Sequence, residues 1–425
     1  MKARKKNAPN NRSRSVQKLF LEQLKELPKI VLKNLVSEKL EKQGFVADVN
    51  LVDALIKHIL SNSQETFEWE DGNKTNSHFE LTFDQTDVAK LEETLKSILL
   101  AIPKIVDVTT ENAAKLGVRA LKKKWPEQSE YENSILFGFQ QRLLTRWGKG
   151  LELLRILLTA CREVNVEEYQ KARKSKSTKN QTLSEVLVRL HARACQVSTE
   201  ILVLLENGLA DGAMARWRTL FEIGVVITLL VDGGEILAKH YADHEIVDRK
   251  TAFDEYERSH VLLGFRSTPI KEKKRLLKAF SEVENIYGKE FSKPYGWAAK
   301  YLKKKKVTFL DLENAAQKSA MRSYYKLASN NVHAGALGIS HRLGVMGSTS
   351  LILSGPSNAG LIEPGQNMAI TISQITALLL NRRPAKIDQI IMMKMLFLLK
   401  EEIIVALSQA HRKLEQEHKS EMGKI

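Results

Sequence analysis

The chain is poor in cysteine, with only Cys161 and Cys195 among 425 residues. Both stand in apolar stretches with helical spacing, and neither belongs to a C-x-x-C motif. Two such residues cannot build a disulfide framework or a zinc knuckle, and they are typical of a reducing compartment. We therefore expect a cytoplasmic protein.

Long apolar runs are also absent. The longest, Ile223–Val231 and Ile390–Leu399, fall well short of the about 20 residues that a membrane span needs. The basic start of the chain is not followed by an apolar segment, so it does not have the form of a secretory signal. We expect a soluble protein without a membrane partner.

Several signatures of catalytic and nucleotide sites are missing. The chain has no G-x-x-x-x-G-K-[ST] phosphate loop, and the glycines between Gly344 and Gly360 lack its lysine. No G-x-S-x-G motif occurs, and no pair of catalytic carboxylates stands out. Nucleotide-dependent and serine-hydrolase functions therefore lack support, and we expect no cofactor.

Acidic residues are fewer than basic ones. The chain has 66 Lys and Arg but 50 Asp and Glu, which gives a net charge of +16. Such an excess favours an anionic partner such as RNA or DNA, although basic soluble proteins without one also have it. Three segments concentrate the excess: the start of the chain, Lys171–Lys179 and Lys303–Lys306. The residues that we expect to contact phosphates are Lys5, Lys6, Arg12, Arg173, Lys174, Lys304 and Lys305.

The first part of the chain is predicted to hold a disordered basic arm, residues 1–15, and a small helical domain, residues 16–124. Within that domain Phe67–Glu70 and His78–Phe83 alternate polar and apolar residues around Asp71-Gly72-Asn73, which is typical of a β-hairpin. A proline ends the third of its expected helices. These helices are Val16–Lys42, Asp48–Leu60 and Thr86–Leu100, the last followed by Pro103.

Residues 125–425 are predicted to form a second domain, a helical bundle, so the fold class is mainly α. Glycines crowd Gly335–Gly365, where Leu343–Met346 and Thr349–Leu353 predict a small glycine-rich β-like insertion. Lys171–Lys179 is expected to be a solvated loop. The expected helices are Glu130–Val164, Leu183–Asn207, Asp211–Val231, Glu235–Leu263, Lys271–Tyr287, Leu310–Ser329 and a stretch from Ala369 that is broken at Arg383-Pro384.

The segment Asp211–Glu222, DGAMARWRTLFE, places charges on a helix that is otherwise apolar. Asp211 is expected to cap the helix. Arg218 and Glu222 stand four residues apart and share a face, whereas Arg216 lies on another face. Because buried charges are costly unless they are paired or used, Arg218 is either a phosphate clamp held by Glu222 or half of a structural ion pair.

A polar cluster, Ser329-Asn330-Asn331-Val332-His333, follows the helix expected at Leu310–Ser329. If the helix continues to Asn330, this side chain lies on the packed face and His333 follows the helix end. A histidine there can act as a general acid or base, or it can simply bind a backbone carbonyl. Taken together, we predict a catalytic site of Arg218, Glu222, Asn330 and His333.

A polar stripe also follows the segment Glu235–Leu263. His240 and His244 are spaced for one divalent metal ion, with Asp248 as a third ligand one turn later. No glutamate stands between the histidines in the H-E-x-x-H arrangement. Most such stripes are the wet side of an amphipathic helix, so we predict no metal site and keep these three residues as an alternative.

The R-x-x-x-E pair before an apolar run and the distal S-x-x-x-H resemble a bacterial family known as domain of unknown function 5677. The resemblance covers about Leu183–Leu380. It implies a mostly helical cytoplasmic protein and carries neither a substrate nor a mechanism. The basic, helical chain also invites comparison with HEPN (higher eukaryotes and prokaryotes nucleotide-binding) ribonucleases, in which Arg precedes His by four to six positions. Here the nearest arginine before His333 is Arg322, so Arg218 would have to act from another helix, which weakens the nuclease hypothesis.

Three functions stay open. The leading hypothesis is a nucleic-acid-directed protein, such as a ribonuclease-like effector in bacterial defence or a toxin. The alternative is a non-catalytic module for binding protein or nucleic acid, and the third is a metal-dependent hydrolase. Convergence of Arg218, Glu222, His333 and His240 in one pocket would favour an enzyme. The substrate, a protein partner and a homo-oligomer are left open.

Overall fold

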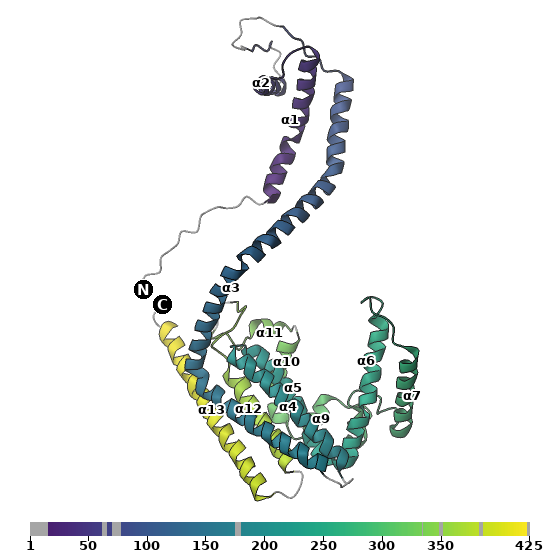
Figure 1. The fold of residues 1–425 in the computed structure, drawn as a ribbon, viewed down its shortest axis with the longest axis vertical. Coiled ribbons are helices and arrows are strands. Elements are labelled where there is room, and N and C mark those ends of the chain that lie inside the picture. The colour runs from purple at the N-terminus through teal and green to yellow at the C-terminus, as the bar shows by residue number, and fades with distance from the viewer. Residues whose placement is uncertain are drawn as a thin grey trace. The chain divides into compact units, whose positions relative to one another are not determined.

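The structure is a computed structural model that describes residues 16–61, 66–69, 78–174, 180–333, 335–347, 352–381 and 386–422. Within these ranges the chain is helical with irregular connections and contains no β-strand, which confirms the mainly α fold class (Figure 1). None of the helices in the described ranges has both the length and the apolar character of a membrane span. The chain divides into two compact units, residues 1–130 and 131–425.

The first unit has a small core between α1 (Val16–Lys42) and α2 (Val49–Leu60). Asp48 caps α2 by accepting the Asn50 N–H. The core is built from residues that recur at helical spacing on the facing sides of the two helices. They are Val36, Leu40, Leu51, Val52, Leu55 and Ile56.

The predicted hairpin is not confirmed, because neither residues 66–69 nor 78–84 have strand structure, while Asp71-Gly72-Asn73 lies outside the described residues. The segment after it packs on α1 instead. Lys39 Nζ donates to the Thr82 carbonyl at 2.8 Å, and the Gln43 side chain donates to the Glu80 carbonyl at 2.7 Å. Side chains at and just after the end of α1 therefore satisfy two carbonyls that a partner strand would otherwise bind.

Pro103 does not end a helix as the sequence predicted. Helix α3 spans Gln85–Lys174 and contains both Pro103 and Pro126. A proline removes one backbone hydrogen bond from a helix, at a cost of about 3 kcal/mol. The long helical stretches on either side outweigh that loss here. Residues 171–174 of the expected loop extend α3, and residues 175–179 lie outside the described residues.

The second unit is built around α4 (Gln181–Glu206) and α5 (Ala210–Asp243), which form a hairpin. Helix α12 (Ile362–Leu380) packs on both, and α13 (Ile387–Met422) packs on α12. Residues 131–174 of α3 contribute buried side chains such as Leu143 and Trp147 to the same core. Gly208 turns the hairpin with φ +69°, where an added Cβ would come within 2.7 Å of the Ser357 carbonyl oxygen.

Two sequence expectations about α5 are wrong. Asp211 does not cap the helix, because its carboxylate accepts the Leu343 N–H at 3.0 Å and pairs with Arg342 at 2.9 Å. These bonds hold Leu343–Met346 as a turn rather than a strand, while residues 348–351 lie outside the described residues. The helix expected at Glu235–Leu263 is divided, because α5 kinks at Gly234 and ends at Asp243 before α6 (Glu245–Ser259) begins.

The helix expected at Leu310–Ser329 is also divided. It consists of α9 (Phe309–Ala315), a 3₁₀ turn η2 (Ser319–Met321) and α10 (Arg322–Val332). Thr308 and Asp311 form a capping box at α9, and Gln317 adopts a left-handed conformation after it. The residues of Leu310–Ser329 therefore do not share one continuous helical face. The remaining elements are α7 (Ile270–Tyr287) and the short η1 (Gly296–Ala298), α8 (Ala299–Leu302) and α11 (Ala336–Ser340).

A buried histidine joins α3, α4 and α12 in this core. The His191 ring is fully buried, its Nδ1 accepts from the Asn165 amide at 3.1 Å, and its Nε2–H donates to Thr376 Oγ1 at 2.9 Å. Burial lowers the pKa of His191 from 6.5 to about 4. The folded chain therefore favours the neutral ring, and this contribution to stability is complete above pH 6.5 and is lost as the pH falls towards 4.

We expect the free energy of unfolding to fall by about 2 kcal/mol between pH 7 and pH 5 because of this one group. His191→Gln keeps a side chain that can bind Thr376 but does not titrate, so its unfolding energy should fall less over the same interval. Urea titrations at the two pH values measure the difference. The exposed His341 provides the control, and equal pH dependence of His191→Gln and His341→Gln would contradict the expectation.

Candidate functional site

Three of the four predicted catalytic residues meet between α5 and the end of α10. Arg218 and Glu222 lie one turn apart on α5, with Arg218 Nε 3.1 Å from Glu222 Oε1. The guanidinium Nη1 of Arg218 lies 3.4 Å from Nε2 of His333, which directly follows α10. The side chains of Arg218 and Glu222 are 22% and 35% exposed, and His333 is exposed. The ion pair is therefore accessible to a ligand rather than sealed in the core.

Tyr325 organises this cluster, although the sequence did not point to it. Its hydroxyl donates to Glu222 Oε1 at 2.8 Å, so one carboxylate oxygen accepts from both Tyr325 and Arg218. The guanidinium carbon of Arg218 lies 4.8 Å from the centre of the Tyr325 ring. These contacts hold the Arg218 side chain on two sides, and its Nη1 lies 3.4 Å from His333 Nε2.

Burial and the bond to Glu222 raise the pKa of Tyr325 to about 12, so its hydroxyl stays protonated and continues to donate at neutral pH. A second tyrosine, Tyr295, lies close to the same charges. Burial raises its pKa, and the Glu222 carboxylate adds to the effect. The cluster therefore combines one carboxylate, one guanidinium, one imidazole and two protonated phenols.

A second arginine, Arg322, also lies near the Tyr325 ring. Arg322 stands 5.4 Å from the ring centre and pairs with Glu313, whose side chain is completely buried. Because one of its outer nitrogens is already bound to a buried carboxylate, Arg322 supports the cluster, although its side chain is 28% exposed. Tyr325, Arg322 and Glu313 carried no signal in the sequence, since aromatic and charged residues at helical spacing occur on many surfaces.

The other polar residues singled out in the sequence lie elsewhere. Arg216 pairs with Glu200 of α4, on a different face of α5. Asn330 is half-buried near the end of α10, where its Oδ1 lies 3.5 Å from the position a Cβ would take on Gly335. No hydrogen bond joins it to Arg218 or Glu222 within the described residues. Asn330 thus borders the site without contacting it.

The histidine stripe is divided by the break between α5 and α6. His244 Nε2 lies 3.1 Å from the Lys293 carbonyl, and Nδ1 lies 3.6 Å from Asp248. His240 packs on the Tyr287 ring, with 4.8 Å between ring centres. Among the described residues, no three His, Cys, Asp or Glu side chains are grouped to hold a metal ion. The structure therefore adds no support for the metal-site alternative.

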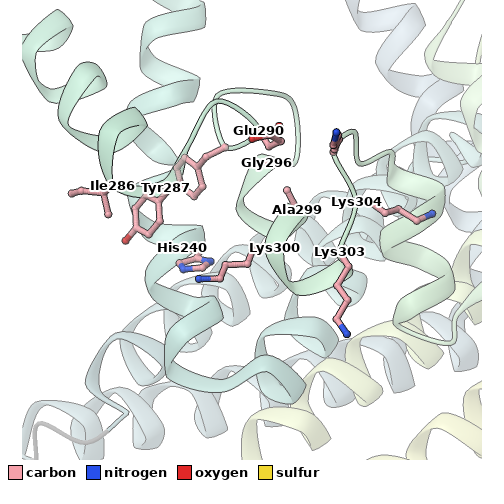
Figure 2. A pocket seen from close by; sticks show the side chains of 11 residues that line it. His240, Ile286, Tyr287, Glu290, Gly296, Ala299, Lys300, Lys303 and Lys304 are labelled. Carbon is pink, nitrogen blue, oxygen red and sulfur yellow. The ribbon is translucent and has the colours of Figure 1, made fainter.

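His240 does not join Arg218 but lines a cavity of about 300 Å³ between the end of α5, the end of α7 and α8 (Figure 2). Lys304 and Lys305 line the same cavity. Lys304 Nζ lies 2.5 Å from Asp311, so part of its charge is compensated. Of the other predicted phosphate contacts, Arg173 and Lys174 are exposed at the end of α3, and Lys5, Lys6 and Arg12 lie outside the described residues.

The comparison with protein families bears on this region alone. Residues 184–349 match a family of unknown function, DUF5677. The match confirms the resemblance seen in the sequence, and it contains Arg218, Glu222, Tyr325 and His333. No curated protein and no solved structure matched the chain. The family name carries no activity, so the chemistry has to be argued from the site.

The bond between Tyr325 and Glu222 should contribute to stability. Removing the hydroxyl in Tyr325→Phe keeps the ring under Arg218 but takes one donor from a carboxylate, so we expect the free energy of unfolding to drop by about 1.5 kcal/mol. Denaturant unfolding measures this change. Tyr324→Phe is the matched control, because the neighbouring Tyr324 is 40% exposed. A loss of the same size in both variants would show that the bond to Glu222 is not responsible.

Proposed function

We propose that the second unit binds RNA and cleaves it without a metal ion, with Arg218 and His333 as its catalytic residues. The single observation that supports this proposal is the distance of 3.4 Å between Arg218 Nη1 and His333 Nε2, two side chains separated by 115 positions. A guanidinium that is held in place is a suitable ligand for a phosphate group. An exposed imidazole next to it is a suitable proton acceptor.

The proposed step is an intramolecular transesterification at a phosphodiester of the RNA strand. A neutral imidazole has one ring nitrogen without a proton, and His333 would act with Nε2 as that nitrogen once the bound phosphate replaces it as the partner of Arg218. This nitrogen takes the proton of a ribose 2′-hydroxyl, and the 2′-oxygen attacks the adjacent phosphorus. The bond from phosphorus to the 5′-oxygen breaks, and that oxygen takes a proton from water. The products are a 2′,3′-cyclic phosphate and a 5′-hydroxyl end.

Arg218 would stabilise the charge that builds on the phosphoryl oxygens during this step. Glu222 and Tyr325 act on Arg218, not on the substrate, and are positioning residues. No arginine stands four to six residues before His333 in the sequence, so the proposal needs an arginine from another helix. Arg218 can supply the missing group from α5 because the fold brings the two helices together.

The same geometry fits a non-catalytic module that binds RNA through Arg218 and the lysine-rich segments. The two functions differ in what His333 does. In an enzyme this residue is needed for cleavage but not for binding, whereas in a module it contributes at most one contact. An effector role in bacterial defence or as a toxin would follow from the cleavage activity.

For the enzyme, His333→Ala should abolish cleavage of single-stranded RNA and the growth arrest caused by induced expression, while the thermal midpoint of unfolding stays within a few degrees of wild type. The exposed ring makes no core contact whose loss would unfold the chain. Total-RNA integrity after induction and cleavage of a labelled oligonucleotide measure the activity. His341→Ala, which removes another exposed histidine, is the control and should behave as wild type.

If wild type leaves the RNA intact but binds it, the catalytic proposal fails and the binding module stands. In the same assay, Arg218→Lys distinguishes the effect of the positive charge from that of the planar guanidinium group. It keeps a cation but loses the planar fork, so we expect at least a roughly tenfold loss of cleavage, equivalent to about 1.4 kcal/mol of transition-state binding.

RNA binding should weaken steeply with added salt if lysines and arginines bind phosphates. For single strands, the slope of log K against log salt changes by about 0.7 for each phosphate that the protein no longer neutralises. Arg173→Ala with Lys174→Ala should therefore reduce the slope by about 1.4. The exposed pair Lys271 and Lys274 on α7 serves as the control for net charge. An unchanged slope in the first variant would remove Arg173 and Lys174 from the interface.

A further inference from the structure

The cavity beside His240 is separate from the Arg218 cluster and has an unusual charge. Four of its lining residues are lysines, namely Lys300, Lys303, Lys304 and Lys305, and one is an acid, Glu290. Lys304 is paired with Asp311. Within the described part of the chain, Lys300, Lys303 and Lys305 form no side-chain ion pair. A concave site of this kind concentrates positive potential.

The backbone that carries these lysines is held in a defined shape. Gly296 lies so close to the preceding loop that an added Cβ would stand 2.1 Å from the Phe291 carbonyl oxygen. Trp297 next to it is buried against the Tyr241 ring. Lys303 ends α8 in a left-handed conformation with φ 52°. The turn therefore carries Lys300 and Lys303–Lys305 on a backbone of defined shape. In Figure 2 the side chain of Lys300 extends towards His240, whereas those of Lys303 and Lys304 extend in other directions.

The opposite wall is aromatic and partly apolar. Tyr287 and Phe291 stack with 4.4 Å between ring centres, and the His240 ring packs against both. Burial lowers the pKa of His240, and the nearby charge of Lys300 adds to that effect. A neutral imidazole can donate one hydrogen bond without adding a further charge. Ile286 and Ala299 supply apolar surface for the rest of a ligand.

We propose that this cavity binds a small molecule that carries two or more linked phosphates, of the nucleoside di- or triphosphate class. A volume of about 300 Å³ is at the lower end for ligand pockets and suits one such molecule. Lys300, Lys303 and Lys305 are exposed and have no acidic partner among the described residues, so their ammonium groups can bind a ligand that carries more than one negative charge. The chain has no phosphate loop, so recognition rests on lysine side chains rather than on backbone N–H groups. The proposal does not depend on RNA cleavage at Arg218.

Calorimetric titration of the full chain with pyrophosphate, ATP and orthophosphate tests the proposal. We expect one site that binds pyrophosphate and ATP and binds orthophosphate at least roughly tenfold more weakly. Lys300→Ala with Lys303→Ala should weaken pyrophosphate binding by roughly tenfold or more. Lys289→Ala with Lys306→Ala removes the same charge from exposed positions that do not line the cavity, so it should change binding by no more than about twofold.

Glu290→Gln is expected to increase the affinity for pyrophosphate, a result that misfolding cannot produce. It removes the acid from the lining, so pyrophosphate should bind roughly threefold more tightly. Absence of pyrophosphate binding at low ionic strength overturns the proposal, as does equal weakening in the two double variants. Weaker binding of single-stranded RNA by Lys300→Ala with Lys303→Ala, with pyrophosphate binding unchanged, would assign these lysines to a nucleic-acid surface instead and would also overturn it.

Discussion

The burial of Trp217 between α5 and α12 is the constraint on which the candidate site depends. Its indole N–H lies 3.1 Å from the Asn367 carbonyl oxygen and 3.0 Å from Thr371 Oγ1 of α12, and its ring is completely buried. Successive residues on a helix point about 100° apart. Fixing Trp217 towards α12 therefore turns Arg218 towards α10, where Tyr325 and His333 lie. Packing in the core thus sets the direction of the polar group beside it.

Helical periodicity was enough to predict the fold class and most helices. The expected range Val16–Lys42 is the observed α1, and α4, α7 and α2 differ from expectation by only a few residues. The failures have local causes. Prolines were treated as breaks although α3 continues through them, and the break at His244 has no proline or glycine next to it. The predicted hairpin is not confirmed in the described residues, and alternation alone does not supply a partner strand.

The site was predictable in part. Spacing placed Arg218 and Glu222 on one face, and the polar cluster drew attention to His333, but no local pattern can tell which distant helices meet. The importance of Tyr325 follows from the packing of α10 on α5, which a sequence window does not contain. Asn330 was assigned to the site from a helical face that crosses η2, where the helix is interrupted. The lysine-lined cavity needs α5, α7 and α8 together, so only part of it was visible as a charged segment.

The pair of Glu313 and Arg322 has a consequence for the evolution of this chain. Glu313 is fully buried, Arg322 is the ion-pair partner of Glu313, and the second carboxylate oxygen has no hydrogen-bond partner among the described residues. Replacing Arg322 alone leaves the buried Glu313 carboxylate without compensation, which costs several kcal/mol, and replacing Glu313 alone leaves the partly exposed Arg322 without its partner. Substitutions at the two positions should therefore be inherited together. Among relatives, we expect positions 313 and 322 to covary, so that a neutral residue at one position occurs together with a neutral residue at the other.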